Sequence, residues 1–288
     1  MKFISLMTGL LFSLNAGALS VDFYNTKLQK FEDIKSVLSS IPDETTIIMG
    51  EEHYNSLVQE TEGFVVETFV QAKNAKGAFT AAWEFLDYPD QQKVTDAFLN
   101  WKQSLLDDDQ FLTEVFGTSN RAQSHKVYLP FLRAVKNLGG ELLATNAPRD
   151  WKRVITTSGL SSLDPKLIPP NMELGSANYY DRFKLVMQDH VPADKLQNYF
   201  EAQCYTDAVM SNQIMGQSKF SLRFMVVGSF HSDYFDGLVE NYKKIVSLPV
   251  VTLKLVDASQ LTQDEVDALL IEDPQHGRLA DYILLIKP

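Results

Sequence analysis

The sequence predicts an α/β protein: a mostly parallel central sheet with helices on both faces and a helical insertion or subdomain. Three observations support this fold class. Short runs of apolar and β-branched residues alternate with longer segments whose apolar residues recur at helical spacing. Strands that alternate with helices form parallel sheets covered on both faces. A mostly helical section, introduced by a proline-rich break at residues 164–170, precedes the fourth strand.

The first 18 residues have the pattern of a cleaved secretory signal peptide. Met1-Lys2 precedes a short apolar run at 3–14, and the small residues Ala16-Gly17-Ala18 follow it. The run is too short to cross a bilayer, although a buried N-terminal helix is the alternative. No cysteine follows it, so there is no lipobox. We therefore expect a periplasmic or secreted protein with one domain over residues 19–288 and no transmembrane segment in the mature chain.

Length, composition and charge narrow the class of protein. At 288 residues, with 45% hydrophobic and 22% charged residues, the chain is globular and long enough for one large domain. Its net charge of −11 argues against nucleic acid or an anionic membrane as the main partner, while a local cationic pocket remains compatible. The single cysteine, Cys204, rules out an internal disulfide, so stability must come from core burial.

The first half of the mature chain contains three predicted strands, at 45–49, 77–85 and 141–145. The expected helices lie at 22–40, after a cap at Asn55 or Ser56, from Pro89, and at 129–138 before Gly139-Gly140. Residues 100–128 are expected to form a helical insertion or lid, with an irregular, acidic run around 107–109. That acidic run predicts a solvated surface, because the spacing and glycine of a calcium-binding loop are absent.

The second half opens with the helical section at about 165–218, which contains helices at 177–188 and about 194–216. The alternating pattern then returns. Strands are predicted at 223–227, 250–256 and 282–286, with a helix capped by Ser232 and another at 262–270.

Polar residues follow four successive predicted strands. In open parallel sheets, binding sites form in the crevice at the carboxyl ends of the strands, so these side chains should converge. They are His53 with Glu51 and Glu52, then Glu84, then Asn146 with Arg149, and finally His231.

Two of these strand ends share one motif, Gly-x-x-His. Gly50 and His53 form the first copy, and Gly228 and His231 form the second. With 14 glycines and 5 histidines, chance predicts about a quarter of one such match. Two matches, both at predicted strand ends, therefore favour a shared site over two unrelated polar positions. Adjacent side chains at a strand exit point opposite ways, so Glu51 and Glu52 do not both face the site.

These residue types suit either of two chemistries. His53, Glu84 and His231 are ligands for a divalent metal such as zinc, manganese or iron with an open position for water. Glu51 would then act as a general base and Arg149 would hold an anionic group. Without a metal, the same residues can perform acid–base chemistry, with His53 as the base and Glu51 or Glu84 orienting it. The candidate catalytic residues are thus Glu51, His53, Glu84 and His231.

Several segments together resemble a known family. They are GEEH, the strand that ends in Glu84, the run VYLPFLRAVKNLGGELLATNAPRDWKRVITTSGLSSL, the helix AQCYTDAVM, and GSFHSDY. This set resembles the ChaN-like haem-binding uptake family of bacteria. That family belongs to the Tiki superfamily, which has two GxxH motifs and also includes Tiki metalloproteases and erythromycin esterases. The resemblance covers roughly residues 45–242.

The resemblance implies roles for particular residues. It adds Gln203 and Asp207 on the helical motif to the site, beside Asn146 and Arg149. It implies haem binding, in some members as a stacked pair across a homodimer, with a tyrosine as the iron ligand. Phenolate is an accepted axial ligand of haem iron, and Tyr234, three residues after His231, is the candidate. Other available tyrosines are Tyr54, Tyr88, Tyr179, Tyr180 and Tyr205.

Two functions therefore stand at the level of sequence. One is an exported haem-binding protein of haem or iron uptake, with Arg149, Lys152 and Arg153 as cations for the propionates. The other is a metal-dependent hydrolase that acts on a small-molecule or peptide ligand through the paired GxxH site.

Overall fold

The computed structural model describes residues 19–117, 119–170 and 172–288, so the predicted signal peptide lies outside the described residues. The described residues form one eight-stranded sheet in the order β2-β1-β8-β7-β3-β6-β4-β5. The strands are β1 (Ser20–Asn25), β2 (Lys30–Glu32), β3 (Thr46–Glu51), β4 (Phe79–Asp87), β5 (Glu141–Asn146), β6 (Leu222–Gly228), β7 (Val250–Asp257) and β8 (Tyr282–Lys287). All pairings from β8 to β5 are parallel, which confirms the predicted α/β class and mostly parallel sheet.

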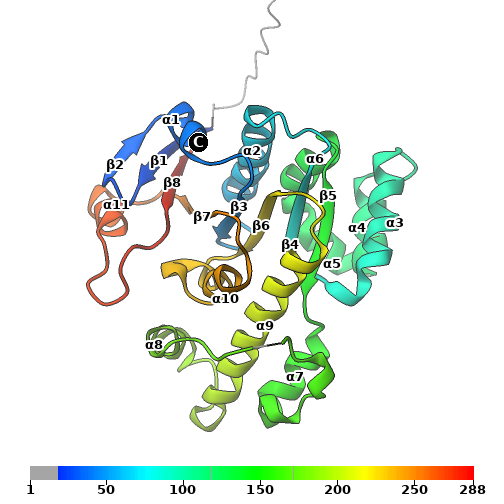
Figure 1. The fold of residues 1–288 in the computed structure, drawn as a ribbon, viewed down its shortest axis with the longest axis vertical. Coiled ribbons are helices and arrows are strands. Elements are labelled where there is room, and N and C mark those ends of the chain that lie inside the picture. The colour runs from blue at the N-terminus through cyan, green and yellow to red at the C-terminus, as the bar shows by residue number, and fades with distance from the viewer. Residues whose placement is uncertain (1–18, 118, 171) are drawn as a thin grey trace, which may run out of the picture.

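Helices cover both faces of the sheet (Figure 1). One face packs against α2 (Ser56–Ala72) and α6 (Leu129–Asn137), and the other against α9 (Leu196–Gln217) and α10 (Leu238–Ile245). Alternation along β3 divides the two cores, because Ile47 and Met49 join the first and Ile48 joins the second. A strand buried on both faces is mostly apolar, as residues 47–50 of β3 and 224–228 of β6 are.

The remaining helices lie at the margins of the sheet (Figure 1). They are α1 (Ile34–Ser40), α3 (Gln91–Lys102), α4 (Asp108–Phe116), α5 (Ser119–Ser124), α7 (Arg149–Ser158), α8 (Ala177–Met187) and α11 (Gln263–Leu270). Short 3₁₀ turns connect them. In the described part of the chain, no helix combines the length and apolarity needed to cross a membrane.

Most predicted elements agree with the structure, and the helix starts show why. Asn55 caps α2 by accepting hydrogen bonds from the backbone N–H groups of Leu57 and Val58, as its position predicts. Pro148 precedes α7 directly, where its missing N–H costs no helical hydrogen bond.

The prediction of a helix over 22–40 is wrong for its first two thirds. Residues 20–32 form the antiparallel pair β1–β2, and β1 also pairs along its whole length with β8. Leu28 and Phe31, which gave the segment its helical spacing, are each 53% exposed at the hairpin. Pairing with β8 thus outweighs the local periodicity, because it buries Phe23 and satisfies the backbone of both strands.

Two further predictions require correction. Ser232 does not cap a helix, because 3₁₀ turns carry the chain to Gly237, after which α10 begins at Leu238. The acidic run at 107–109, expected to be irregular, is the start of helix α4. Asp107 in this run accepts a hydrogen bond from the Gln110 N–H and so begins α4, an effect that the charge count alone does not reveal.

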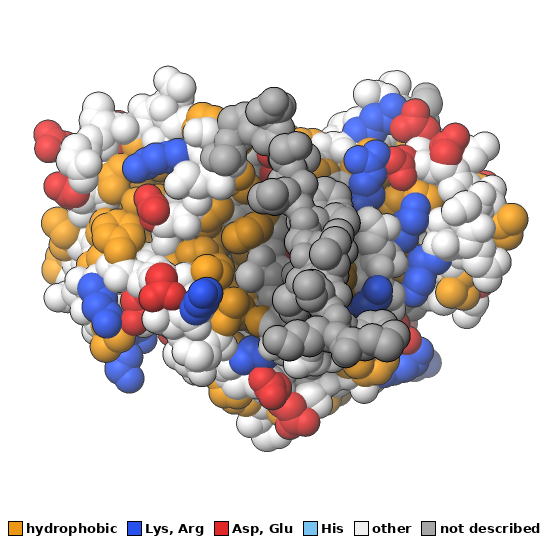
Figure 2. Space-filling view, turned by 90° about the horizontal axis from the view of Figure 1, so that it is seen from above, with side chains coloured by type: hydrophobic (Ala, Val, Ile, Leu, Met, Phe, Trp, Pro, Cys, Tyr) orange, Lys and Arg blue, Asp and Glu red, His pale blue; other side chains and the backbone are white. Residues whose placement is uncertain are grey.

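Charged side chains of both signs are dispersed on the face shown in Figure 2, with no large area of a single sign. This distribution fits a solvated surface. A net charge of −11 therefore does not arise from one acidic patch on that face.

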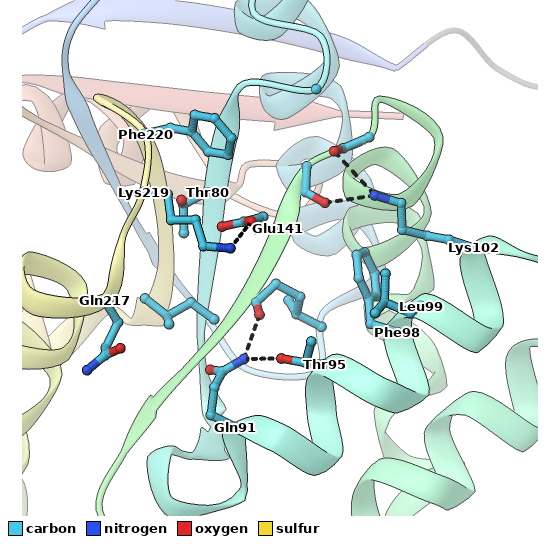
Figure 3. A pocket seen from close by; sticks show the side chains of 15 residues that line it. Thr80, Gln91, Thr95, Phe98, Leu99, Lys102, Glu141, Gln217, Lys219 and Phe220 are labelled. Atoms are coloured by element: carbon cyan, nitrogen blue, oxygen red, sulfur yellow. Dashed lines mark hydrogen bonds and ion pairs between the residues drawn. The ribbon is translucent and has the colours of Figure 1, made fainter.

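A cavity of about 400 Å³ lies beside the edge strand β5, at its start (Figure 3). An edge strand exposes unpaired backbone groups. Here the side chain of Gln91 on α3 pairs with them: its Nε2 donates to the Leu142 carbonyl at 3.1 Å, and its Oε1 accepts from the Ala144 N–H at 2.7 Å. One amide side chain thus occupies the place of a neighbouring strand.

We predict that Gln91→Leu destabilises the protein by about 1–3 kcal/mol, because it leaves a backbone donor and acceptor without partners. The adjacent Gln92 is a matched control, since its amide bonds only the exposed Asp96 one turn away. Gln92→Leu should stay within about 0.5 kcal/mol of the parent chain. Urea unfolding measures both, and equal midpoints for the two variants would contradict the role given to Gln91.

Candidate functional site

The two GxxH motifs meet because their strands are neighbours. β6 lies between β3 and β4, and Glu51 pairs in register with Gly228. Each glycine makes room for the other motif. A Cβ on Gly228 would lie 2.7 Å from His53 Nε2, and a Cβ on Gly50 would lie 2.3 Å from the Ser232 Oγ. Neither position tolerates a side chain without displacing its partner motif.

His53 lies between two carboxylates. Its Nδ1 donates to Glu51 Oε1 at 2.8 Å, and its Nε2 lies 3.6 Å from Glu84 Oε1. Burial lowers the pKa of His53, but the hydrogen bond to Glu51 and the negative charge of Glu84 outweigh it and raise the pKa above its ordinary value. The ring is therefore held in one orientation and is readily protonated.

Glu51 is 1% exposed and is fixed by three neighbours. The Tyr128 hydroxyl donates to its Oε1 at 2.8 Å, beside the His53 ring, and the Gln59 amide donates to its Oε2. A buried carboxylate needs such donors, because transfer from water without them is costly. Burial and the Glu51 charge in turn raise the pKa of Tyr128, so its hydroxyl stays protonated as a donor.

A second acid, Glu62, lies beneath Glu51 on α2. It is fully buried, and neither of its side-chain oxygens has a hydrogen-bond partner. Burial first, and then the neighbouring Glu51 charge, raise the pKa of Glu62 well above its ordinary value. Both effects favour the neutral carboxylic acid form of Glu62 beside the Glu51 carboxylate.

Glu84 and Asn146 join the site from the adjacent strands. Glu84 is 8% exposed, and its Oε2 accepts a hydrogen bond from the Gly228 N–H. The Asn146 amide donates to the Glu84 backbone carbonyl at 2.8 Å and accepts from Lys152 Nζ at 3.0 Å. Asn146 therefore supports the Glu84 backbone and brings the charge of Lys152 to the carboxyl end of β5.

His231 has its own carboxylate. Its Nδ1 lies 2.5 Å from Asp207 Oδ1 on α9, and the Gln203 amide lies 3.0 Å from the same nitrogen. Burial lowers the pKa of His231, but the Asp207 charge, together with that of Glu84, raises it overall. The other Asp207 oxygen accepts a hydrogen bond from the Tyr179 hydroxyl at 2.8 Å.

The two imidazoles line one cavity of about 290 Å³. Its polar floor comes from the GxxH motifs and α9, and its apolar wall comes from α8 and Phe230. The lining residues are Glu51, His53, Phe183, Val186, Met187, Gln203, Gly228, Ser229, Phe230 and His231. In Figure 1, α7, α8 and the start of α9 gather beyond one end of the sheet, where this cavity lies.

An aromatic cluster borders His53 on its other side. The Phe85 ring centroid lies 4.9 Å from that of His53, and Tyr54, His125 and Tyr128 pack around Phe85. Burial lowers the pKa of His125, which favours its neutral form among these rings. Tyr54 has a left-handed backbone (φ 63°) and is 49% exposed, so it stands at the surface next to His53.

Two predicted site residues lie elsewhere. Tyr234 does not line the cavity; its ring packs between the Arg182 guanidinium at 4.6 Å and His276 at 5.2 Å. Arg149 is exposed at the start of α7, and Lys152 one turn later makes the contact with Asn146 instead. Glu52 is exposed, as strand alternation predicts.

Sequence reasoning missed Gln59, Glu62 and Tyr128, and it named Tyr179 only as an alternative iron ligand, not as the partner of Asp207. The sequence held a clue to Gln59 and Glu62, because they are polar residues three positions apart on the apolar, buried face of α2. Tyr128 and Tyr179 had none, because only the tertiary fold brings their hydroxyls to Glu51 and Asp207.

The described residues include no group of three or more His, Cys, Asp or Glu side chains placed to hold a metal ion. His53 lies between Glu51 and Glu84, and His231 faces Asp207, so each imidazole contacts its own carboxylates. The metal set of His53, Glu84 and His231 stays a prediction.

A family model described as haem-binding uptake, Tiki superfamily, ChaN matches residues 37–241. The chain belongs to this family. Both GxxH motifs, Tyr128, Tyr179 and Asp207 fall within the matched region. The match confirms the family that the motifs indicated.

Comparison with solved structures agrees with the fold of this ChaN-family chain. A structure described as cofacial haem binding to ChaN of Campylobacter jejuni superposes with a TM-score of 0.70 at 17% identity, covering 93% of this chain and 97% of the other. The type III effector HopBA1 gives a TM-score of 0.47 at 13% identity, covering 86% and 90%. A search of the curated proteins found no match.

We predict that Glu62→Gln changes how the stability of this ChaN-family protein depends on pH. Below the ordinary carboxyl pKa, the folded and unfolded chains both hold the proton. Above it, the unfolded chain releases the proton and the folded chain keeps it, because the folded pKa is raised. The wild type should therefore lose up to about 1.4 kcal/mol per pH unit relative to Glu62→Gln until the folded pKa is reached.

Urea unfolding at pH values from 5 to 8 tests this expectation. Glu67→Gln, on the exposed face of the same helix, is the control and should follow the wild-type curve. A pH-independent difference between wild type and Glu62→Gln would show that Glu62 is already ionised in the folded protein.

Proposed function

We propose that this protein binds haem at the cavity of His53 and His231, as part of haem or iron uptake. The observation that carries the proposal is an apolar wall facing a polar floor with two oriented imidazoles, in a chain of a haem-binding uptake family. A porphyrin has apolar faces and a polar metal centre, and such a cavity matches both. The ChaN of Campylobacter jejuni, which shares the fold, is described as binding haem cofacially.

The residues present fit a partly enclosed haem. The cavity of about 290 Å³ is near the lower end of the roughly 300–1,000 Å³ typical of small-molecule sites. A haem would therefore have one side on the wall formed by Phe183, Val186 and Phe230 and the other side exposed. Such a group supplies iron for delivery, and the role of this chain is to bind and orient it.

Positive charge for the propionates is available at the carboxyl end of β5. Lys152 and Arg149 lie there on the first turn of α7. Burial lowers the pKa of Lys152, and the nearby negative charges of Asp87 and Glu84 oppose that effect. A cation next to an anionic ligand group gains strong charge-assisted hydrogen bonds. We assign these two side chains, with Asn146, to the anionic edge of the ligand.

The experiment that tests the function is titration of the purified protein with haemin, followed through the Soret band. We expect a saturable shift in wild type. Val186→Asp should weaken haemin binding at least about tenfold, because it places a carboxylate on the apolar wall. Leu185→Asp is the matched control, since the adjacent Leu185 is 69% exposed and does not line the cavity.

Two outcomes would count against the proposal. A wild-type protein without a saturable Soret shift does not bind haemin at all. Equal losses of affinity in Val186→Asp and Leu185→Asp would place the ligand away from this wall.

The tyrosine that ligates iron is better assigned to Tyr54 than to Tyr234. Neither tyrosine lines the cavity, but Tyr54 follows His53 directly and is exposed beside its ring, whereas Tyr234 packs against Arg182. We predict that Tyr54→Phe shifts the Soret and visible bands of the ferric haem complex, because phenolate ligation is lost. Tyr234→Phe should leave the spectrum unchanged, and the reverse pattern would restore Tyr234 as the ligand.

A further inference from the structure

Helix α8 contributes to the site in two ways at once. Phe183, Val186 and Met187 form the apolar wall of the cavity. Tyr179, one turn before Phe183, points its hydroxyl to the carboxylate of Asp207 beneath the cavity floor. Residues spaced four, seven and eight positions apart share one face of a helix, so a single face carries both features.

The contacts of Tyr179 form a closed network with no solvent access. Tyr179 and Asp207 are both 0% exposed. The hydroxyl donates to Asp207 Oδ2 at 2.8 Å and accepts from the Gln203 amide at 3.1 Å. The other oxygen of Asp207 holds His231 Nδ1 at 2.5 Å. Each carboxylate oxygen thus has its own donor, and rotation of the carboxylate would break both bonds.

α8 is also fixed to the loop that carries His231. Arg182 donates to the Asp233 carbonyl at 2.9 Å and to Asp236 Oδ2 at 2.7 Å. Its guanidinium lies 5.0 Å from the Phe230 ring centroid, and Phe230 stacks on Tyr179 at 5.3 Å. The cavity wall, the hydroxyl and the histidine loop are therefore held together as one packed unit.

We propose that Tyr179 is a positioning residue: its hydroxyl fixes Asp207 so that His231 donates through Nδ1 and presents Nε2 to the cavity. A carboxylate that orients one ring nitrogen of a histidine sets the tautomer and leaves the other nitrogen for a ligand. Tyr179 orients the carboxylate itself, one step further from the ligand. The haemin-binding measurement rests on the proposed function, whereas the NMR measurement of the His231 tautomer does not.

The test compares Tyr179→Phe with Tyr180→Phe. Tyr180 is the neighbouring residue, packs edge-on against Phe200 at 4.9 Å, and has no hydroxyl hydrogen bond within the described residues. ¹⁵N NMR of the histidine side chains at one fixed pH reports which ring nitrogen of His231 carries the proton. We expect Tyr179→Phe to move the two His231 ring signals toward a mixture of tautomers, and Tyr180→Phe to leave them in place.

With haemin as the probe, Tyr179→Phe should bind about tenfold more weakly than wild type, the low end of the effect usual for such outer partners. Unchanged His231 signals in folded Tyr179→Phe would overturn the proposal, whatever the haemin result. A wild type that binds no haemin would refute the proposed function and leave the NMR comparison valid.

A measurement on the wild type covers the case in which Tyr179→Phe does not fold. The hydrogen bond from His231 Nδ1 to Asp207 Oδ1 requires the proton on Nδ1. The ¹⁵N signals of neutral His231 in the wild type should therefore show a protonated Nδ1 and an unprotonated Nε2. Signals that place the proton on Nε2 would also overturn the proposal.

Discussion

The site depends on the close packing of two strand ends, β3 and β6, which only glycine allows. Gly228 leaves space for the His53 ring, and Gly50 leaves space for the turn that contains Ser229 and Ser232. A methyl group at either position would overlap atoms of the opposite motif at 2.3–2.7 Å. The pairing of β3 with β6 in the parallel sheet sets this distance, so the two GxxH motifs form one structural unit contributed by distant parts of the sequence.

This packing concentrates buried acids, and the rest of the site compensates for them. Glu51 and Asp207 are almost fully buried, and each carboxylate has an imidazole and a tyrosine hydroxyl as donors. Buried charges without such partners would cost several kcal/mol each. Glu62 reduces that cost differently, because its raised pKa favours the neutral form. The two halves of the site thus repeat one arrangement of carboxylate, imidazole and phenol on different elements.

Sequence patterns were sufficient for the parallel strands β3 to β8 and for the residues that follow them, but not for β1 and β2. Short buried strands and capped helices are local signals, and the crevice rule then brings His53, Glu84, Asn146 and His231 to one edge. The residues that support them could not be found this way. Tyr128 and Tyr179 reach the site only through tertiary packing, and the β1–β2 hairpin forms because β8 pairs with it. Local periodicity in the sequence reveals neither side-chain packing between distant elements nor pairing with a distant strand.

The arrangement separates two tasks between different parts of the chain. The strand ends and their glycines place the two GxxH motifs beside each other. The cavity wall comes from α8 in the helical section before β6, where side chains such as Val186 are half exposed. Substitutions there change the shape offered to a ligand at little cost to the core. The strand ends therefore determine which chemical groups meet the ligand, and α8 determines which ligand fits.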